Sequence, residues 1–498
     1  MPNPVINYFA EFKILKSASK DFWLTNAIQF FDGLAYFSMI TVLALYLTTN
    51  CGFNDVDSGV WVGIYTLYIT AFVFAVGSIC DVIGIKKSFY IGIALLAVSR
   101  LGLGLAPNMD VLKEHRIASC LVALFPGTGE GMLQTEDLKY VVRALIIIMA
   151  LGTAFMVPVT MTSLRRFTSK QTRATGFNVY YLIMNIGAII AGAVVIDGFR
   201  NSRLGEVNGN LAIFDFGFVM ALCTFACTFF INEENYAEES ERLAGGHAAK
   251  RPLAIFMEVW KESAFQKLLL FLALTIGVRL VFTHQFLVMP KYYTRVLYSD
   301  FQLGLANSIN PFIIVVGLIV LIPVINRYAT VRLIIIGMVV SASSLVIMAV
   351  PLEWALAIPG VRNVTQAYFV MIVTQILVFA VGELIFMPRF TEYIASVAPK
   401  DKVSSYMALS ALPSFISKPI NGFVSGILIS RYCYDGIRPK IETGNITYHQ
   451  SPEFMWLIYL LLAVLSPIAV IAMRNFLTSK DAGETPDQPE PAAEGNTP

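Results

Sequence analysis

Residues 77–87 read Gly-Ser-Ile-Cys-Asp-Val-Ile-Gly-Ile-Lys-Lys, with Gly77, Asp81, Gly84, Lys86 and Lys87 at fixed spacing. Apolar runs at 60–80 and 88–106 flank this charged, glycine-containing stretch. Each run is close to the roughly 20 residues that a helix needs to cross the hydrocarbon core of a bilayer. The stretch therefore predicts a tight turn at which two membrane helices reverse direction.

The rest of the chain repeats this pattern. Only 14% of the 498 residues are charged, against about 25% in soluble domains. The apolar residues fall into twelve runs, at 22–48, 60–80, 88–106, 139–160, 174–198, 212–231, 265–290, 301–324, 332–351, 367–391, 403–430 and 453–476. Since a helix pairs its backbone polar groups internally, such runs span membranes as helices. The sequence predicts an all-α membrane protein with twelve transmembrane helices.

Polar segments divide these helices into two sets of six. We expect an N-terminal six-helix bundle at 1–231, a cytoplasmic linker at 232–264, a C-terminal six-helix bundle at 265–477 and a disordered acidic tail at 478–498. Lys and Arg concentrate on cytoplasmic loops of membrane proteins. With the N-terminus inside, the inner segments hold 21 of these residues and the outer segments 11. We therefore expect a cell-membrane protein, bacterial or eukaryotic, with both termini in the cytoplasm.

Several function classes lack their sequence signals. The chain has no Walker phosphate loop, no His-Glu-x-x-His or Cys/His metal cluster and no Gly-x-Ser-x-Gly motif. We therefore expect no enzyme activity, cofactor, metal or nucleic-acid partner. The expected partners are the lipid bilayer, a small-molecule or peptide substrate and protons, and the expected state is a monomer.

Charged residues inside the predicted helices are candidates for a functional site, because a charge in the hydrocarbon region costs a few kcal/mol. The deep ones are Asp32, Arg100, Arg279, Glu383 and Lys418, and Arg143 lies nearer an outer end. Three deep cations against two carboxylates favour an anionic or carboxylated ligand. Asp32 is a candidate proton site or the partner of an arginine. The structural alternatives are a Glu383–Lys418 ion pair, a helix-bend hydrogen bond of Asp32 near Gly33, and helix-locking pairs for the cations.

Arg279 and a histidine near it in the sequence have side chains suited to specific roles. Arg279 offers a bidentate fork suited to a carboxylate. His284, five residues further on, has a side chain that titrates near neutral pH. A lone histidine is also a common packing residue, so both roles stay open.

The turn at 77–87 resembles the loop between helices 2 and 3 of the major facilitator superfamily of transporters. That resemblance implies two six-helix bundles that rock around a mid-membrane site. It also implies that Gly77, Asp81, Gly84, Lys86 and Lys87 act in conformational change.

Three further segments resemble the proton-dependent oligopeptide transporters within that superfamily. The first is Phe177-Asn-Val-Tyr-Tyr181-Leu-Ile-Met-Asn185-Ile-Gly-Ala, the second is Asn310-Pro311, and the third is Gly382-Glu383 with Ala398-Pro399 beyond it. The resemblance implies that Tyr181, Asn185, Asn310 and Glu383 line a substrate site. With Arg279 they are the expected substrate-binding residues, and Glu383, Asp32 and His284 the expected proton-coupling residues.

The sequence departs from that family at two charged positions. The family's first-helix Glu-x-x-Glu-Arg-Phe is reduced here to Asp32-Gly33, and Val157 stands where a lysine precedes Pro158. We therefore keep three hypotheses. The first is proton-coupled symport of small peptides or similar carboxylated solutes, and the second is an uncoupled facilitator or exporter of organic anions or drugs. The third is a membrane sensor or scaffold that does not transport.

Overall fold

The computed structural model describes residues 18–109, 137–168, 173–202, 204–233, 263–298, 301–325, 329–397, 412–474 and 476. These residues are almost entirely helical. Most of the expected linker, the acidic tail and the outer loop at 107–138 lie outside the described residues, as does Ala398-Pro399.

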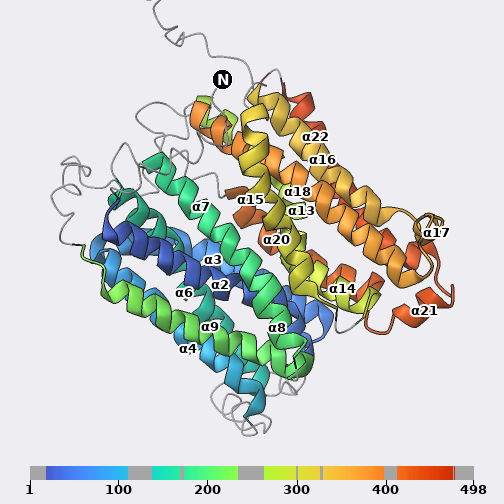
Figure 1. Cartoon of the computed structure of the whole chain (residues 1–498), viewed down its shortest axis with the longest axis horizontal. Helices are drawn as coiled ribbons and strands as arrows, with labels where there is room; N and C mark the ends of the chain where they lie inside the picture. Colours follow the sequence, from blue (N-terminus) through green and yellow to red (C-terminus); the bar gives the residue numbers. More distant parts are fainter. Residues whose placement is uncertain are drawn as a thin grey trace, which may run out of the picture.

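The first half of the chain forms one bundle, coloured blue to green in Figure 1. Its helices are α2 (Lys20–Thr49), α3 (Asp55–Ile83), α4 (Ile85–Leu105), η2 (Ala106–Asn108), α6 (Asp137–Arg166), α7 (Arg173–Ile190), η5 (Ala191–Ile196), α8 (Asp197–Arg200) and α9 (Gly205–Phe229). Local sequence sets several of the ends. Ser19 Oγ and Asn54 Oδ1 accept hydrogen bonds from backbone amides in the first turns of α2 and α3.

The second half forms a bundle coloured yellow to red beside the first (Figure 1). Its helices are α12 (Ser263–Leu274), α13 (Ile276–Leu287), α14 (Met289–Val296), α15 (Leu303–Ile325), α16 (Thr330–Ala349), α17 (Leu352–Leu356), α18 (Val364–Val397), α20 (Leu412–Tyr432), α21 (Arg438–Glu442), η8 (Tyr448–Gln450) and α22 (Pro452–Ala472). Between the bundles, α3 packs on α20, and α7 with η5 packs on α15.

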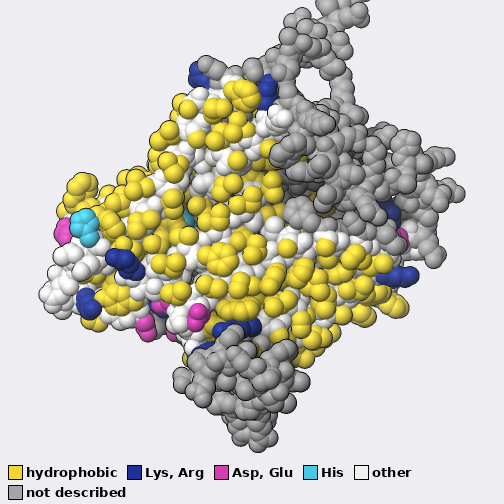
Figure 2. Space-filling model, turned by 180° about the vertical axis from the view of Figure 1, so that it is seen from behind, with side chains coloured by type: hydrophobic (Ala, Val, Ile, Leu, Met, Phe, Trp, Pro, Cys, Tyr) yellow, Lys and Arg dark blue, Asp and Glu magenta, His cyan; other side chains and the backbone are white. Residues whose placement is uncertain are grey.

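The prediction of a multi-pass helical membrane protein is confirmed. Within the described residues, ten helices are long and apolar enough to cross a membrane, and α12 with α13 makes an eleventh span bent by 48°. The apolar part of α15, Leu303–Leu318, coincides with the remaining predicted run. Figure 2 shows a broad apolar surface on one face with charged side chains towards its edges, as expected for helices that face lipid.

The bend in the seventh predicted helix, at the break between Leu274 and Ile276, coincides with a contact from the last helix. Ser466 Oγ of α22 accepts a hydrogen bond from the backbone N–H of Val278 at 3.0 Å. A Cβ added at Gly277 would lie 2.6 Å from the same oxygen, so only glycine allows this approach. A side chain inserted into the helical hydrogen-bond ladder bends the helix.

We call one end of the bundles the outer end and the other the inner end, following the predicted orientation. The outer end carries the loop at 50–54, and the inner end carries the turn at Gly84. The polar contacts that join the two bundles, among the described residues, lie at the outer end and at mid-depth.

Candidate substrate site and outer closure

Glu383 of α18 lies at mid-depth and accepts a hydrogen bond from the side chain of Asn310 on α15. The Asn310 Nδ2 to Glu383 Oε2 distance is 2.9 Å. Arg279 of α13 and Tyr181 of α7 are near enough to Glu383 to interact with it electrostatically. Tyr181 belongs to the N-terminal bundle and the other three residues to the C-terminal bundle. The structure thus brings four of the five expected substrate-binding residues together between the bundles.

Arg279 is surrounded by aromatic rings. Its guanidinium carbon is 4.5 Å from the centre of the Phe390 ring, and 5.3 and 5.4 Å from those of Phe386 and Phe282. Its Nη1 is 3.1 Å from Met387 Sδ. Aromatic faces stabilise a desolvated cation, but here they also cover the guanidinium. Its fork is therefore less accessible to a ligand than the sequence suggested.

Asn185 shares a helix face with Tyr181, as its spacing predicts, but its amide is already engaged. Asn185 Nδ2 donates to the backbone carbonyl of Tyr181 at 2.8 Å. That bond uses one of the two N–H donors of the amide, and the residue is 6% exposed. Asn310, by contrast, donates directly to Glu383.

Asp32 and Arg100 form an ion pair inside the N-terminal bundle. Arg100 Nη2 lies 2.8 Å from Asp32 Oδ1, and the arginine side chain is only 2% exposed. Arg100 Nη1 also donates to the carbonyl of Gly217. This geometry corresponds to the arginine-partner alternative and leaves Asp32 outside the group around Glu383.

His284 is buried away from that group. Its ring packs edge-on against Tyr459 and Trp456, with centroids 4.1 and 5.5 Å away. Neither ring nitrogen has a hydrogen-bond partner among the described residues. Arg143 likewise lies among rings, those of Phe53, Trp61 and Tyr140, near the outer end.

The suggested Glu383–Lys418 ion pair is absent from the described contacts. Lys418 Nζ instead donates to the hydroxyl of Tyr36 at 3.3 Å. Tyr36 lies on α2, in the other bundle. The reason is directional, because Lys418 on α20 extends towards the N-terminal bundle, whereas Glu383 is engaged by Asn310 of its own bundle.

The turn at 77–87 is tied to its own bundle. Gly84 has φ +88°, a conformation that L side chains rarely adopt, and it ends α3 and begins α4. Glu233 accepts hydrogen bonds from the backbone amides of Ile85 and Lys86 and pairs with Arg166. Lys86 Nζ donates to the carbonyls of Phe229, the last residue of α9, and of Ile231 just beyond it.

The structure shows fewer contacts for the other residues predicted to act at this turn. Lys87 is exposed. Gly77 and Asp81 lie in α3, but their side-chain surroundings are outside the described residues.

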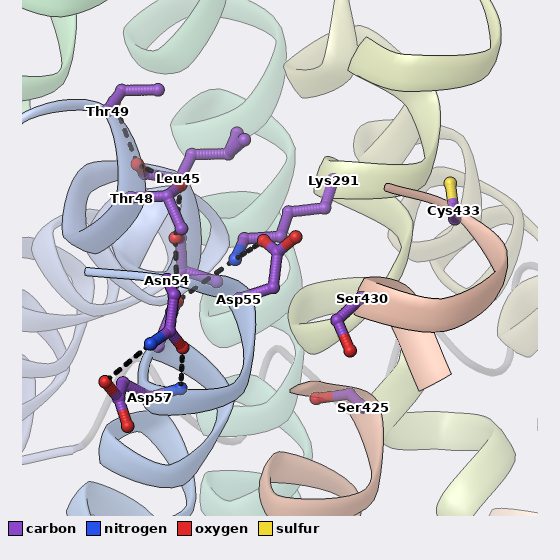
Figure 3. A network of polar contacts seen from close by, with 12 residues as sticks. Leu45, Thr48, Thr49, Asn54, Asp55, Asp57, Lys291, Ser425, Ser430 and Cys433 are labelled. Carbon is purple, nitrogen blue, oxygen red and sulfur yellow. Dashed lines mark hydrogen bonds and ion pairs between the residues drawn. The ribbon is translucent and has the colours of Figure 1, made fainter. Parts of the chain in front are cut away.

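An ion-pair cluster that the sequence reasoning missed joins the bundles at the outer end (Figure 3). Asp55, the first residue of α3, lies 2.9 Å from Lys291 Nζ and 2.8 Å from Arg295 Nη2, both on α14. Asn54 and Asp57 form a separate cap beside it. The i, i+4 spacing of Lys291 and Arg295, which puts two cations on one helix face, was the available signal.

A second outer contact links α8 to α15. Both carboxylate oxygens of Asp197 accept hydrogen bonds from the first backbone amides of α15, at 2.9 Å from Gly304 N and 2.7 Å from Leu305 N. An acidic group at a helix N-terminus is favoured by the unpaired amides and the helix dipole. The π-helical turn η5 directly precedes Asp197.

Glycines allow the backbones to touch beside both contacts. A Cβ added at Gly59 of α3 would lie 2.5 Å from Gly426 Cα of α20, and one added at Gly422 would lie 2.4 Å from Gly63 Cα. A Cβ at Gly192 would lie 2.4 Å from the Gly304 carbonyl. The outer end is therefore closed by direct backbone contact, with an ion-pair cluster and a helix cap beside it.

Comparison with known proteins identifies the class. The sequence profile of the Major Facilitator Superfamily matches residues 25–417. The chain belongs to the Major Facilitator Superfamily and is a multi-pass membrane transporter, not an enzyme. No curated protein sequence matches it.

Solved structures of POT family transporters share the fold. One, in complex with 5-aminolevulinic acid, has a TM-score of 0.64 at 13% identity, covering 92% of this chain and 96% of the other. A second, in complex with a thioalcohol-conjugated peptide, has a TM-score of 0.65 at 13% identity and the same coverage. An auto-inhibited POT family peptide transporter has a TM-score of 0.63 at 12% identity, covering 95% and 99%. The predicted resemblance to this family is thereby confirmed at the level of the fold.

Proposed function

We propose that the protein is a proton-coupled symporter of small peptides or similar carboxylated solutes that works by alternating access. The observation that carries the proposal is the position of Glu383. It is held by Asn310 at mid-depth and lies within electrostatic range of Arg279 and of Tyr181 in the other bundle. A carboxylate between two moving bundles is suited to bind a substrate ammonium in one state and a proton in another.

The bundles supply the conformational change. The outer closure through Asp55 and Asp197 supports an arrangement in which the site is accessible from the inner side only. Opening that closure exposes the site to the outer side. Protonation of Glu383 removes its charge and changes its attraction to Arg279, so it shifts the balance between the two states. Because Asp32 is paired with Arg100, and His284 packs among rings, we assign the coupling proton to Glu383.

The orientation, domain limits and oligomeric state belong to the same proposal. We assign both termini to the cytoplasm, two bundles at 1–231 and 265–477, and a monomer in the cell membrane. The excess of Lys and Arg in the inner segments supports this orientation.

The test is uptake into liposomes that contain the purified protein and a lumenal pH dye. Addition of di- and tripeptide pools is expected to acidify the lumen. Glu383→Gln is expected to abolish this acidification and concentrative uptake, while exchange of substrate across the membrane continues. Equal, pH-independent loss of uptake and exchange would exclude Glu383 as the proton carrier.

A second candidate is an uncoupled facilitator or exporter of organic anions. Gly33 and Val157, at positions charged in the peptide transporters, favour it. It predicts exchange of organic anions with no acidification, and no difference between wild type and Glu383→Gln in that exchange.

A further inference from the structure

Lys418 occupies a restricted position between the bundles. One turn before it, the carbonyl of Phe415 accepts a hydrogen bond from Thr70 Oγ1 of α3, and one turn after it Gly422 packs against Gly63. Helix α20 thus contacts α3 on either side of Lys418, through a side-chain hydrogen bond at Phe415 and through the backbone at Gly422. Its side chain extends past α3 to Tyr36, near the middle of α2.

The charge of Lys418 has less compensation than the charges of the other two deep cations, since the aromatic ring nearest its ammonium, in the described part of the chain, is that of Tyr36, 5.9 Å away. Arg100 has Asp32 at 2.8 Å. Arg279 has Glu383 within electrostatic range and three aromatic rings around it. Lys418 has no carboxylate within 4.0 Å among the described residues, and its hydrogen bond there is to the neutral Tyr36 hydroxyl. An ammonium at this depth is costly without a counter-charge.

The hydrogen-bonding capacity of the pair fits an anion. Lys418 uses one of its three N–H donors on Tyr36, so two are left. The Tyr36 oxygen accepts from the ammonium and keeps its own O–H to donate. Together the residues offer three donors and one positive charge, which complements the two oxygens of a carboxylate.

We propose that Lys418 and Tyr36 form a carboxylate-binding site between the bundles, and that this site, not Arg279, selects substrates with a free carboxylate. The inference rests on the proposed function for its identification of the ligand as a transported solute. One residue comes from each bundle, so a carboxylate bound to both links them. The aromatic rings around Arg279 leave the N–H donors of that guanidinium less accessible to a ligand.

The test uses pairs of compounds that differ only in the carboxylate. Binding to the purified full-length protein is measured by calorimetry for dialanine against dialanine amide, 5-aminolevulinic acid against its methyl ester, and benzoate against benzamide. The wild type is expected to bind the carboxylate member of at least one pair about tenfold more tightly or better, the size of a charged hydrogen bond.

Lys418→Gln is expected to remove this preference by weakening the carboxylate member alone. Lys418→Arg keeps the positive charge and is expected to retain most of the preference for the carboxylate. Tyr36→Phe removes the hydroxyl that donates to the ligand and accepts from Lys418, but keeps the charge of Lys418, and is expected to reduce the preference by a smaller factor. The last variant is isosteric, so it keeps the test valid if Lys418→Gln does not fold.

Three results would overturn the inference. They are a preference unchanged in Lys418→Gln, an equal weakening of both members of a pair, and no carboxylate bound by the folded wild type. A Lys418-dependent preference seen for benzoate but for neither amino-containing pair would support the carboxylate site and contradict peptide transport. The failure of the site and the failure of the proposed function are thus distinguishable.

Discussion

The carboxylate of Asp55 in the N-terminal bundle lies 2.9 Å from the ammonium of Lys291 in the C-terminal bundle. The lysine side chain is 2% exposed and the aspartate side chain 14%. Since the two residues belong to different bundles, this ion pair exists only while the outer end is closed. It therefore contributes to the free-energy difference between the closed and open outer ends.

Replacing Asp55 with Asn is expected to favour opening of the outer end. It leaves the buried charge of Lys291 without its partner, and breaking a buried pair in this way costs about 3 kcal/mol or more. A cysteine placed at Ser425, which lines the same contact, should react at least about tenfold faster with an impermeant maleimide. The measurement is made after the six native cysteines are replaced by serine.

Asp57→Asn is the matched control. Asp57 pairs with Asn54 outside the inter-bundle contact, so its substitution should leave the labelling rate unchanged. Equal rates in wild type and Asp55→Asn would show that this ion pair does not hold the outer end closed.

Leucine at Gly59 or Gly422 is expected to prevent outer closure. The first added carbon would already lie 2.5 Å or less from the facing backbone, and a backbone cannot move aside as a flexible side chain can. Spin labels at the outer ends of α3 and α20 should report a longer distance than in the wild type, and uptake should be lost.

Gly198→Leu is the control for glycine replacement itself. An added Cβ at Gly198 meets nothing within 4 Å, so transport and distance should both be retained. A Gly59→Leu protein that closes and transports normally would contradict the backbone-contact account.

Removing the charge of Arg100 is expected to destabilise the protein more than removing the whole ion pair. Arg100→Gln leaves Asp32 as an unpaired charge in the bundle, at a cost of about 3–5 kcal/mol. The double variant Arg100→Gln, Asp32→Asn should recover part of the lost melting temperature. If Asp32 instead carries the coupling proton, Asp32→Asn alone will abolish concentrative uptake while the melting temperature stays unchanged.

Alanine at Asn310 is expected to raise the KM for uptake by about tenfold or more, because Glu383 loses a hydrogen bond to a charged group. The comparison is with Asn185→Ala, measured in the same liposomes. The Asn185 amide donates to the backbone of its own helix, so we expect a change of less than about threefold there. Similar effects of the two variants would argue against a special role for Asn310.

Hydropathy predicted the positions of the helices well. All twelve apolar runs coincide with helices, since a membrane leaves a spanning backbone few other choices. Depth alone also identified Asp32, Glu383 and Lys418 as unusual. The Gly84 turn was equally local, because one glycine with positive φ sets it.

The partners of these residues could not be predicted in the same way. Asp55 and Lys291 are 236 positions apart, and their pairing depends on how two bundles are rotated against each other. Hydropathy does not encode that rotation. For the same reason the aromatic rings around Arg279 were missed, since Phe386 and Phe390 come from a helix distant in sequence. The bend between α12 and α13 required knowledge of Ser466 on the last helix.

The backbone contact between Gly59 and Gly426 also affects the permeability of the membrane. No side chain lies between the two backbones at this crossing, so no rotamer change opens a gap there. A file of water molecules through a carrier conducts protons and discharges the membrane potential. These glycines therefore provide electrical insulation that does not depend on salt or on the charge of any side chain.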